Sequence, residues 1–400
     1  MKIIFKLLFI LLFVTVLALV IVYARGYRLD YKKKSLTSTG ILAFTSYPKT
    51  AKIYVDSKLR GVTDSSLIMP PGNYQVDIKK DGYTSLSKKV TLKGELVVTI
   101  DALLFPLNPS LSPLTNLGII KSVAVNDTEK VLIFVDKEIS LDEVDKNGIY
   151  LFESGRRPLP FFPPLKPVIM KKNLPVGVDF ETAEVTVSPD SKEAIFEFGE
   201  NKELAYLLSL ESENLTPFDV AFSKNNLFKA WNEQRQDNYL KILETYPEEF
   251  AKIASASVEI ISFAPSETKL LYKANENLIL PPIITPPLVV TNQTPETRNL
   301  EKGKTYVYDR KEDKNYLIAN CQLPIANCAI QWYFDSRHLV VNEGKKIMVT
   351  DYDGESRQTL YSGPYESSFF MSTLDGRLVV LSNLNPEVNL WPDLYLVGTR

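Results

Sequence analysis

The chain has 400 residues, a formal net charge of −2, and 24% charged residues. It therefore has no basic excess to attract a phosphate backbone, which disfavours nucleic acid as a partner. One histidine and two cysteines leave little material for metal or imidazole chemistry, so we expect no metal and no cofactor. Prolines (25) outnumber glycines (17) and aromatic residues reach 11%, a mix that favours many short strands.

Leu7–Ala24 has no charged residue. A helix of this length covers about 27 Å, close to the hydrocarbon thickness of a bilayer. We predict an uncleaved transmembrane signal anchor here, with residues 1–6 in the cytoplasm. The main alternative is a signal peptide cleaved after the small residue of Val22-Tyr-Ala24. A buried core helix is disfavoured, because nothing adjacent could cover it.

The charges around this segment do not settle its orientation. Basic residues are Lys2 and Lys6 before it, and Arg25, Arg28 and Lys32–Lys34 after it. Counted literally, the positive-inside rule places the rest of the chain in the cytoplasm. A large downstream domain can nevertheless be translocated despite flanking charge, and we place the C-terminus outside. Residues 25–39 are interpreted as a flexible tether, with contact to anionic lipid headgroups as the alternative.

Residues 40–104 have the pattern of a small β-domain. Tyr74–Lys79 alternates apolar and polar side chains, the period of a strand with one buried face. Pro70-Pro-Gly-Asn73 and Asp81-Gly82 are typical of tight turns. No helical period is present, and the pattern predicts a small all-β sandwich or barrel.

The motifs of this module occur in a recognisable order. They are Ser46-Tyr-Pro48, Ala51-Lys-Ile-Tyr-Val-Asp56, Gly61-Val-Thr63, Pro71-Gly-Asn-Tyr74 and Lys80-Asp-Gly-Tyr83. The module resembles the PEGA domain, although Pro48-Lys-Thr-Ala51 keeps only the first and last residues of the name-giving tetrapeptide. The resemblance implies a non-catalytic module of envelope proteins that binds or spaces other domains. It also supports an extracytoplasmic location.

Residues 105–117 contain Pro106, Pro109 and Pro113 and predict a stiff linker. From residue 118 to 400 a unit recurs, made of a strand, a polar turn, a second strand and a tyrosine-containing strand. Ser188-Pro-Asp-Ser-Lys192 marks one such turn. The repeat resembles the blades of TolB-like β-propellers, which carry Ser-Pro-Asp-Gly-Lys at one hairpin.

We expect about six blades, with five or seven as alternatives. The copy near Trp231–Ile253 is degenerate and is a candidate for a helix. Leu280–Arg298 is rich in proline and is interpreted as an inserted loop.

Few residues are candidates for chemistry. His338 lies in a predicted strand and no Gly-x-Ser-x-Gly motif is present, which disfavours a Ser-His-Asp triad. Asp351-Tyr-Asp-Gly-Glu355 lacks the ligand positions of a calcium loop, so a hairpin turn is favoured. Hence we assign no catalytic residue.

Three further features leave alternatives open. Arg156–Pro164 could bind an aromatic groove, although an inter-blade loop is favoured. Trp231, Trp332 and Trp391 could line a sugar-binding face, although core positions are favoured. Cys321 and Cys328 end two copies of Ile-Ala-Asn-Cys and could form a disulfide in an oxidising compartment. The alternatives for this pair are two inert buried thiols, or a metal site that lacks nearby partners.

Together these patterns predict an all-β protein behind one transmembrane helix, with a PEGA-like β-sandwich and a β-propeller. We expect a non-catalytic binding or scaffold protein of the cell membrane, extracytoplasmic in bulk, that contacts envelope proteins or cell-wall polymer. One alternative is a regulatory or sensor subunit of an envelope enzyme complex. Another is a glycoside hydrolase, which would need two carboxylates about 5 to 10 Å apart.

Overall fold

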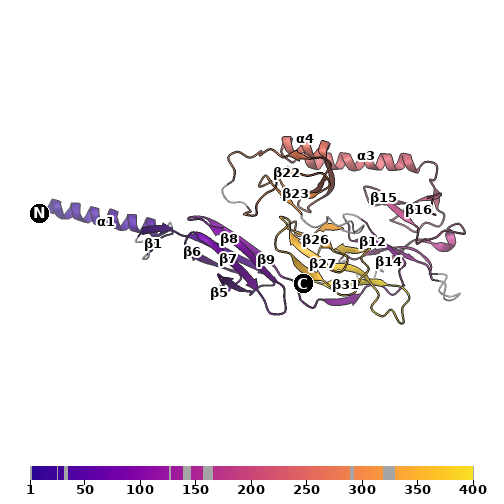
Figure 1. Ribbon diagram of the computed structural model, residues 1–400, viewed down its shortest axis with the longest axis horizontal. Helices are drawn as coiled ribbons and strands as arrows, with labels where there is room; N and C mark the ends of the chain where they lie inside the picture. The colour runs from indigo at the N-terminus through magenta and orange to yellow at the C-terminus, as the bar shows by residue number, and fades with distance from the viewer. Residues whose placement is uncertain are drawn as a thin grey trace. The chain divides into compact units, whose positions relative to one another are not determined.

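The computed structural model describes residues 2–24, 26–30, 35–125, 128–137, 146–155, 165–288, 292–318 and 329–399. The chain divides into two compact units (Figure 1). The first contains Met1–Leu107 together with Pro286–Pro295, and the second contains Asn108–Thr285 and Glu296–Arg400.

The first unit begins with helix α1, Lys2–Ala24. Its segment Ile4–Tyr23 has a mean hydropathy of 3.0 and is not buried by the rest of the chain. The hydroxyl of Thr15 donates to the carbonyl of Leu11 at 2.8 Å, so this polar group is satisfied inside the helix. The helix is long and apolar enough to cross a membrane, a property that anchors and signal peptides share.

The segment after α1 is more ordered than the predicted tether. β1 (Tyr27–Asp30) and β2 (Ser35–Ser38) pair as an antiparallel hairpin. The backbone N–H and the hydroxyl of Thr39 both donate to the carbonyl of Gly26, at 2.9 and 2.6 Å, and close the hairpin at its base. The described part of the predicted tether thus contains a paired hairpin; Arg25 and Lys32–Lys34 lie outside the described residues.

Two sheets follow and form the predicted sandwich. One has the order β6-β3-β9, with β3 (Gly40–Tyr47) and β9 (Val97–Leu103) parallel and β6 (Ser65–Met69) antiparallel. The other has the order β5-β4-β7-β8. Its strands are β4 (Lys52–Val55), β5 (Lys58–Val62), β7 (Gly72–Lys79) and β8 (Ser85–Leu92). Alternate side chains such as Phe44, Ile53 and Ile78 fill one apolar core, which explains the period of two in the sequence.

The described residues of the second unit form five four-stranded antiparallel sheets, here called blades 1 to 5. Blade 1 is β11 (Lys121–Val125), β12 (Lys130–Val135), β13 (Gly148–Glu153) and β14 (Leu165–Met170). Blade 2 is β15 (Glu184–Val187), β16 (Glu193–Phe198), β17 (Leu204–Ser209) and β18 (Phe218–Asp219). Blade 3 is β19 (Val258–Phe263), β20 (Lys269–Ala274), β23 (Thr305–Asp309) and β24 (Lys314–Leu317). Blade 4 is β25 (Ile330–Trp332), β26 (His338–Asn342), β27 (Ile347–Asp351) and β28 (Gln358–Tyr361).

Blade 5 joins the two ends of the propeller sequence. β29 (Phe370–Ser372), β30 (Leu378–Ser382) and β31 (Asp393–Gly398) come from the C-terminal end. Its fourth strand is β10 (Ser110–Pro113), which pairs with β31 from Ser110↔Gly398 to Pro113↔Tyr395. Residues 110–113 are therefore a strand of the propeller, and the interpretation of 105–117 as a linker is wrong at these positions.

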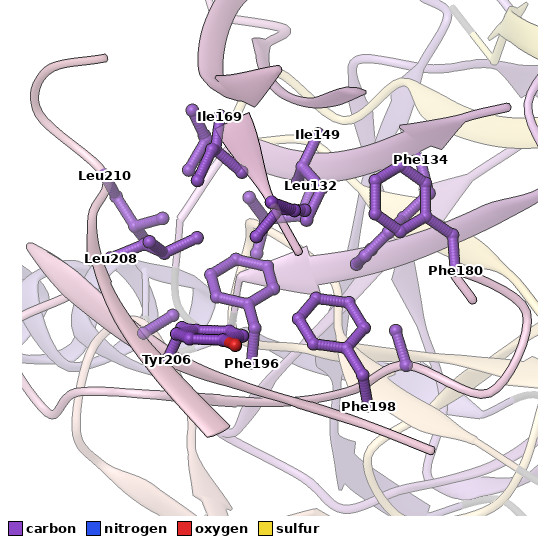
Figure 2. Packing of buried hydrophobic residues seen from close by; sticks show 14 of the residues in the cluster. Leu132, Phe134, Ile149, Ile169, Phe180, Phe196, Phe198, Tyr206, Leu208 and Leu210 are labelled. Carbon is purple, nitrogen blue, oxygen red and sulfur yellow. The ribbon is translucent and has the colours of Figure 1, made fainter. Parts of the chain in front are cut away.

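The blades pack in cyclic order. Blades 1 and 2 share an aromatic core, in which the rings of Phe134 and Phe196 are 6.1 Å apart (Figure 2). Blade 5 packs on blade 1, and blade 3 on blade 4. The amide of Gln331 in blade 4 donates to the Phe370 carbonyl and accepts from the Ser372 N–H of blade 5, at 3.2 and 3.0 Å.

Two helices separate blades 2 and 3. Trp231 of α3 (Lys224–Leu243) packs on Ile195 and Ala205 of blade 2. Phe250 of α4 (Glu248–Ser257) stacks on Tyr308 of blade 3, with ring centroids 3.6 Å apart. The helix pair thus covers the two faces that a sixth blade would cover. The prediction of a propeller with one degenerate, helical copy is confirmed, and five blades is one of the alternatives left open.

Candidate functional site

Four blades carry the same turn between their first and second strands. The fourth residue of each turn has a positive φ: Ser191 at 59°, Glu267 at 55°, Ser336 at 60° and Gly376 at 83°. In three turns an aspartate accepts the backbone N–H two residues later: Asp190 from Lys192, Asp335 from Arg337 and Asp375 from Arg377. The sequence matched only Ser188–Lys192 closely, because the other three turns lack the Ser-Pro pair that begins the motif. The spacing Asp-x-Lys/Arg would have found three of the four turns.

His338 lies buried beside one of these turns. Its Nδ1 is 2.6 Å from Oδ2 of Asp335, and its Nε2 is 3.3 Å from Oδ1 of Asp351. Burial by itself would lower the pKa of His338, but the hydrogen bonds and charges of both carboxylates outweigh it and raise the pKa to about 9. The imidazolium donates from both nitrogens and has none left to accept a proton from a nucleophile. The geometry therefore supports the expectation that His338 has no triad role.

This arrangement predicts a pH dependence of stability. A folded pKa raised from 6.5 to about 9 adds stability that is complete below the unfolded value and is lost as pH rises through about 9. The free energy of unfolding should fall by about 2–3 kcal/mol between pH 6 and pH 10. His338 is the single histidine of the chain, so His338→Gln should flatten this part of the curve. Parallel curves for the two proteins in denaturant titrations would contradict the assignment.

Other buried charges in the propeller also have internal partners. Nζ of Lys269 is 3.5 Å from Oδ2 of Asp309 and 4.5 Å from the centroid of the Tyr352 ring. Nζ of Lys224 is 2.7 Å from Oε1 of Glu197. The first ion pair joins neighbouring strands of blade 3, and the second joins α3 to blade 2, which is a structural use of charge.

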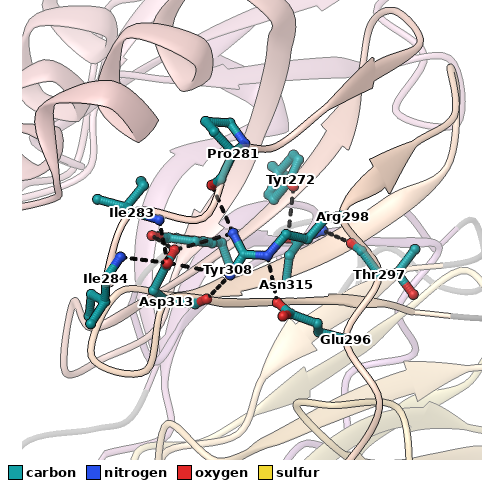
Figure 3. A network of polar contacts seen from close by, with 10 residues as sticks. All are labelled: Tyr272, Pro281, Ile283, Ile284, Glu296, Thr297, Arg298, Tyr308, Asp313 and Asn315. Carbon is teal, nitrogen blue, oxygen red and sulfur yellow. Dashed lines mark hydrogen bonds and ion pairs between the residues drawn. The ribbon is translucent and has the colours of Figure 1, made fainter. Parts of the chain in front are cut away.

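A polar cluster lies in the stretch 275–304 between β20 and β23, here called the excursion (Figure 3). Asp313 is 3% exposed, and its carboxylate accepts the N–H groups of Ile283 and Ile284 at 2.7 and 2.9 Å. It also accepts the hydroxyl of Tyr308 at 2.9 Å. Burial, together with this carboxylate, raises the pKa of Tyr308, so the hydroxyl remains a donor.

Arg298 completes the cluster from the returning side of the excursion. Its Nη2 is 3.4 Å from Oδ2 of Asp313, its Nε is 2.9 Å from Oε2 of Glu296, and its Nη1 donates to the Pro281 carbonyl at 2.8 Å. Burial acts to lower the pKa of Arg298, but both carboxylates outweigh it and raise the pKa. The guanidinium therefore ties together both ends of the inserted loop that the sequence predicted at Leu280–Arg298. β21 (Leu278–Ile279) and β22 (Asn299–Leu300) pair just below it.

The remaining predicted sites have mixed outcomes. Cys321, Cys328 and the segment 156–164 lie outside the described residues. The N–H of Gly354 donates to the Asp351 carbonyl at 2.9 Å, which confirms the hairpin turn in 351–355. Trp231 is buried in an apolar cluster, which confirms a core role for this residue, whereas Trp332 is partly buried against a separate cluster. Trp391, between β30 and β31, is partly buried.

Comparison with protein families matches residues 39–108 to the PEGA domain. No curated protein matches the chain.

The solved structures that match this chain include two TolB proteins. A putative TolB from Agrobacterium tumefaciens is 12% identical with a TM-score of 0.21, and the match covers 64% of this chain and 66% of that one. TolB from Acinetobacter baumannii is 11% identical with a TM-score of 0.21, with 81% and 59% covered. The matches thus span less than two thirds of each TolB chain.

A protein of unknown function from Bacteroides thetaiotaomicron is 12% identical with a TM-score of 0.22, and the match covers 88% of this chain and 78% of that one. At these scores, the propeller assignment depends on the cyclic packing of the blades and on the closing strand β10. Residues 39–108 thus match the PEGA domain, and the blades closed by β10 form a β-propeller.

Proposed function

We propose that this protein is a non-catalytic binding or scaffold protein, held in the cell membrane by α1, that displays its PEGA domain and propeller outside the cytoplasm. The observation that carries the proposal is the exposure of α1. The 20-residue apolar segment Ile4–Tyr23 is not buried by the rest of the chain. The side chains of Phe5 and Leu11 are 77% and 66% exposed. Exposed apolar area costs about 25 cal/mol per Å² in water, and a bilayer removes that cost while the helix satisfies its own backbone.

The buried ionisable groups support binding rather than catalysis. A general acid or base must reach a substrate and have a proton to exchange with it. His338, Asp313 and Lys269 instead direct their polar atoms at partners within the fold. This pattern fits a propeller that serves as a rigid display surface, where loops make the contacts.

The anchor predicts a defined result with intact cells. Added protease should degrade the PEGA domain and the propeller and leave a small membrane-bound stub that retains Lys2. A cytoplasmic protein should stay uncleaved in the intact cells, which shows that the protease did not enter. As a control, the same treatment after lysis should degrade that protein as well. Protection of the full chain in intact cells would place it in the cytoplasm, as the charge count suggests. A mature protein that begins after Ala24 would show that α1 is a cleaved signal peptide.

A binding role predicts retention on envelope material. A soluble variant that lacks residues 1–34 should sediment with isolated cell wall or bind a defined membrane protein. The same variant after denaturation is the control and should bind neither. Release of soluble sugar from the wall during the same incubation would contradict the non-catalytic proposal and favour a hydrolase. Retention without any release of sugar is the expected outcome.

A further inference from the structure

Strand β8 is the last strand of the sheet β5-β4-β7-β8 in the PEGA domain. One side of it pairs with β7, in the register Asn73↔Thr91. The N–H of Thr91 donates to Oε1 of Gln293 at 2.7 Å, and the carbonyl of Thr91 accepts from Nε2 of Gln293 at 2.8 Å. Both backbone groups of an edge residue are thus satisfied by one side chain.

Gln293 belongs to the segment Pro286–Pro295, which is part of the first unit although the chain on either side of it belongs to the second. A primary amide carries one carbonyl acceptor and N–H donors, the same groups as a peptide unit. Gln293 therefore pairs with Thr91 as a residue of an added antiparallel strand would. Outward backbone groups recur at every second residue of an edge strand, so Lys89 and Ser87 have the same orientation as Thr91.

The composition of the segment fits this use. Pro286 and Pro287 begin the segment, and Pro295 ends it. Proline favours an extended backbone over a helix or a hairpin. Both ends of the excursion are held in the second unit, by the bonds of Asp313 to Ile283 and Ile284 and by Arg298. These contacts fix described residues on both sides of Asn292–Thr294, which lowers the entropic cost of bringing Gln293 to β8.

We propose that the outward edge of β8 is a peptide-binding edge of the PEGA domain, and that the chain's own Asn292–Thr294 is its intramolecular occupant. The ligand class is an extended, polar peptide flanked by prolines, recognised through backbone groups in the manner of strand addition. This inference deepens the binding role proposed above. It does not depend on the membrane anchor or on a wall polymer, and it is tested with purified protein.

The test is amide hydrogen exchange at Thr91 in the full chain in detergent. Gln293→Ala removes both bonds and should make the Thr91 amide exchange about five- to tenfold faster, as expected for loss of a typical hydrogen bond. Gln293→Glu keeps an acceptor for the N–H but loses the donor, and should give an intermediate rate. Gln75→Ala is the matched control, because Gln75 donates to Ser87 at 2.8 Å in the same sheet without touching Thr91.

A second arm tests binding in trans. A synthetic peptide of the sequence 286–295, added at millimolar concentration to the Gln293→Ala chain, should restore slow exchange at Thr91, because a tethered segment acts at a similar effective concentration. The same peptide with alanine at the glutamine should not. Equal Thr91 exchange in wild type and Gln293→Ala would overturn the proposal. If the Thr91 amide exchanges faster in Gln293→Ala but the added peptide does not slow it, the proposal that the edge of β8 binds peptides would also be contradicted.

Discussion

Replacing Asp313 by alanine is expected to lower the free energy of unfolding of the propeller by about 3–5 kcal/mol. The carboxylate is 3% exposed and accepts from Ile283, Ile284 and Tyr308. Alanine would leave these three donors without their acceptor and Arg298 with Glu296 as its remaining carboxylate partner, and an unpaired buried group costs more than the bond it made. Asp313→Asn keeps one acceptor oxygen and should cost less.

The measurement is urea denaturation followed by tryptophan fluorescence. All three tryptophans lie in the second unit, so the signal reports the propeller alone. The matched control is Glu233→Ala, which removes an exposed carboxylate 3.9 Å from Nζ of Lys229 on α3. This control should change stability by no more than about 0.5 kcal/mol. If Asp313→Ala costs no more than the control, the cluster does not stabilise the excursion.

Local sequence patterns predicted much of the fold. They succeeded where the order of apolar and polar residues within a single element shows which side chains are buried. Tyr74–Lys79 alternates because one face of β7 meets the sandwich core. The region Trp231–Ile253 lacks that alternation because its residues form α3 and α4 instead of strands. In both cases the period of the side chains reflects the secondary structure directly.

Long-range pairing was not visible in the same way. Ser110–Pro113 contains a proline and has no alternating pattern, so it resembles a linker until it is paired with β31 at the other end of the chain. Proline is tolerated there because β10 is an edge strand. The partners of His338 show the same limit. Asp335 is three residues away in sequence, whereas Asp351 lies opposite His338 only through the register of β26 and β27.

The polar cluster at the excursion could not be predicted for the same reason. The sequence indicated an inserted loop from its prolines, but Asp313, Arg298 and Ile283 come together only once β21 pairs with β22 and β23 pairs with β24. Gln293 likewise gives no signal, because it is one of four consecutive polar residues, 291–294, in a loop rich in proline. Its role depends on which edge strand of the first unit it meets.

Disrupting β10 should be as costly as removing Asp313, because this strand closes the ring of blades. Replacing Ser110–Pro113 by Pro-Asp-Pro-Asp keeps the length of the chain but removes donors and places charge beside β31. The bonds between β10 and β31 and the packing of Leu111 would be lost, at about 1 kcal/mol per bond. We expect a loss of about 3–5 kcal/mol and faster unfolding.

The connection behind β10 reinforces this expectation. Oδ1 of Asp393 accepts the hydroxyl of Thr115 and the N–H groups of Leu117 and Gly118, at 2.9, 2.7 and 3.2 Å. These bonds hold residues 114–118 against the start of β31, and they weaken when β10 no longer aligns the two segments. The same Pro-Asp-Pro-Asp replacement in the exposed loop Pro386–Asn389 is the matched control, and it should cost less than about 1 kcal/mol.

Limited proteolysis gives an independent measurement of the same closure. In the wild type, residues 110–113 should resist cleavage because their backbone is paired in a sheet, whereas the β10 variant should be cut there quickly. The cut should separate Met1–Leu107 covalently from the rest of the chain, so a denaturing gel should show one small and one large fragment. Equal cleavage of 110–113 in both proteins, together with unchanged unfolding, would mean that β10 is a linker after all and that the ring closes without it.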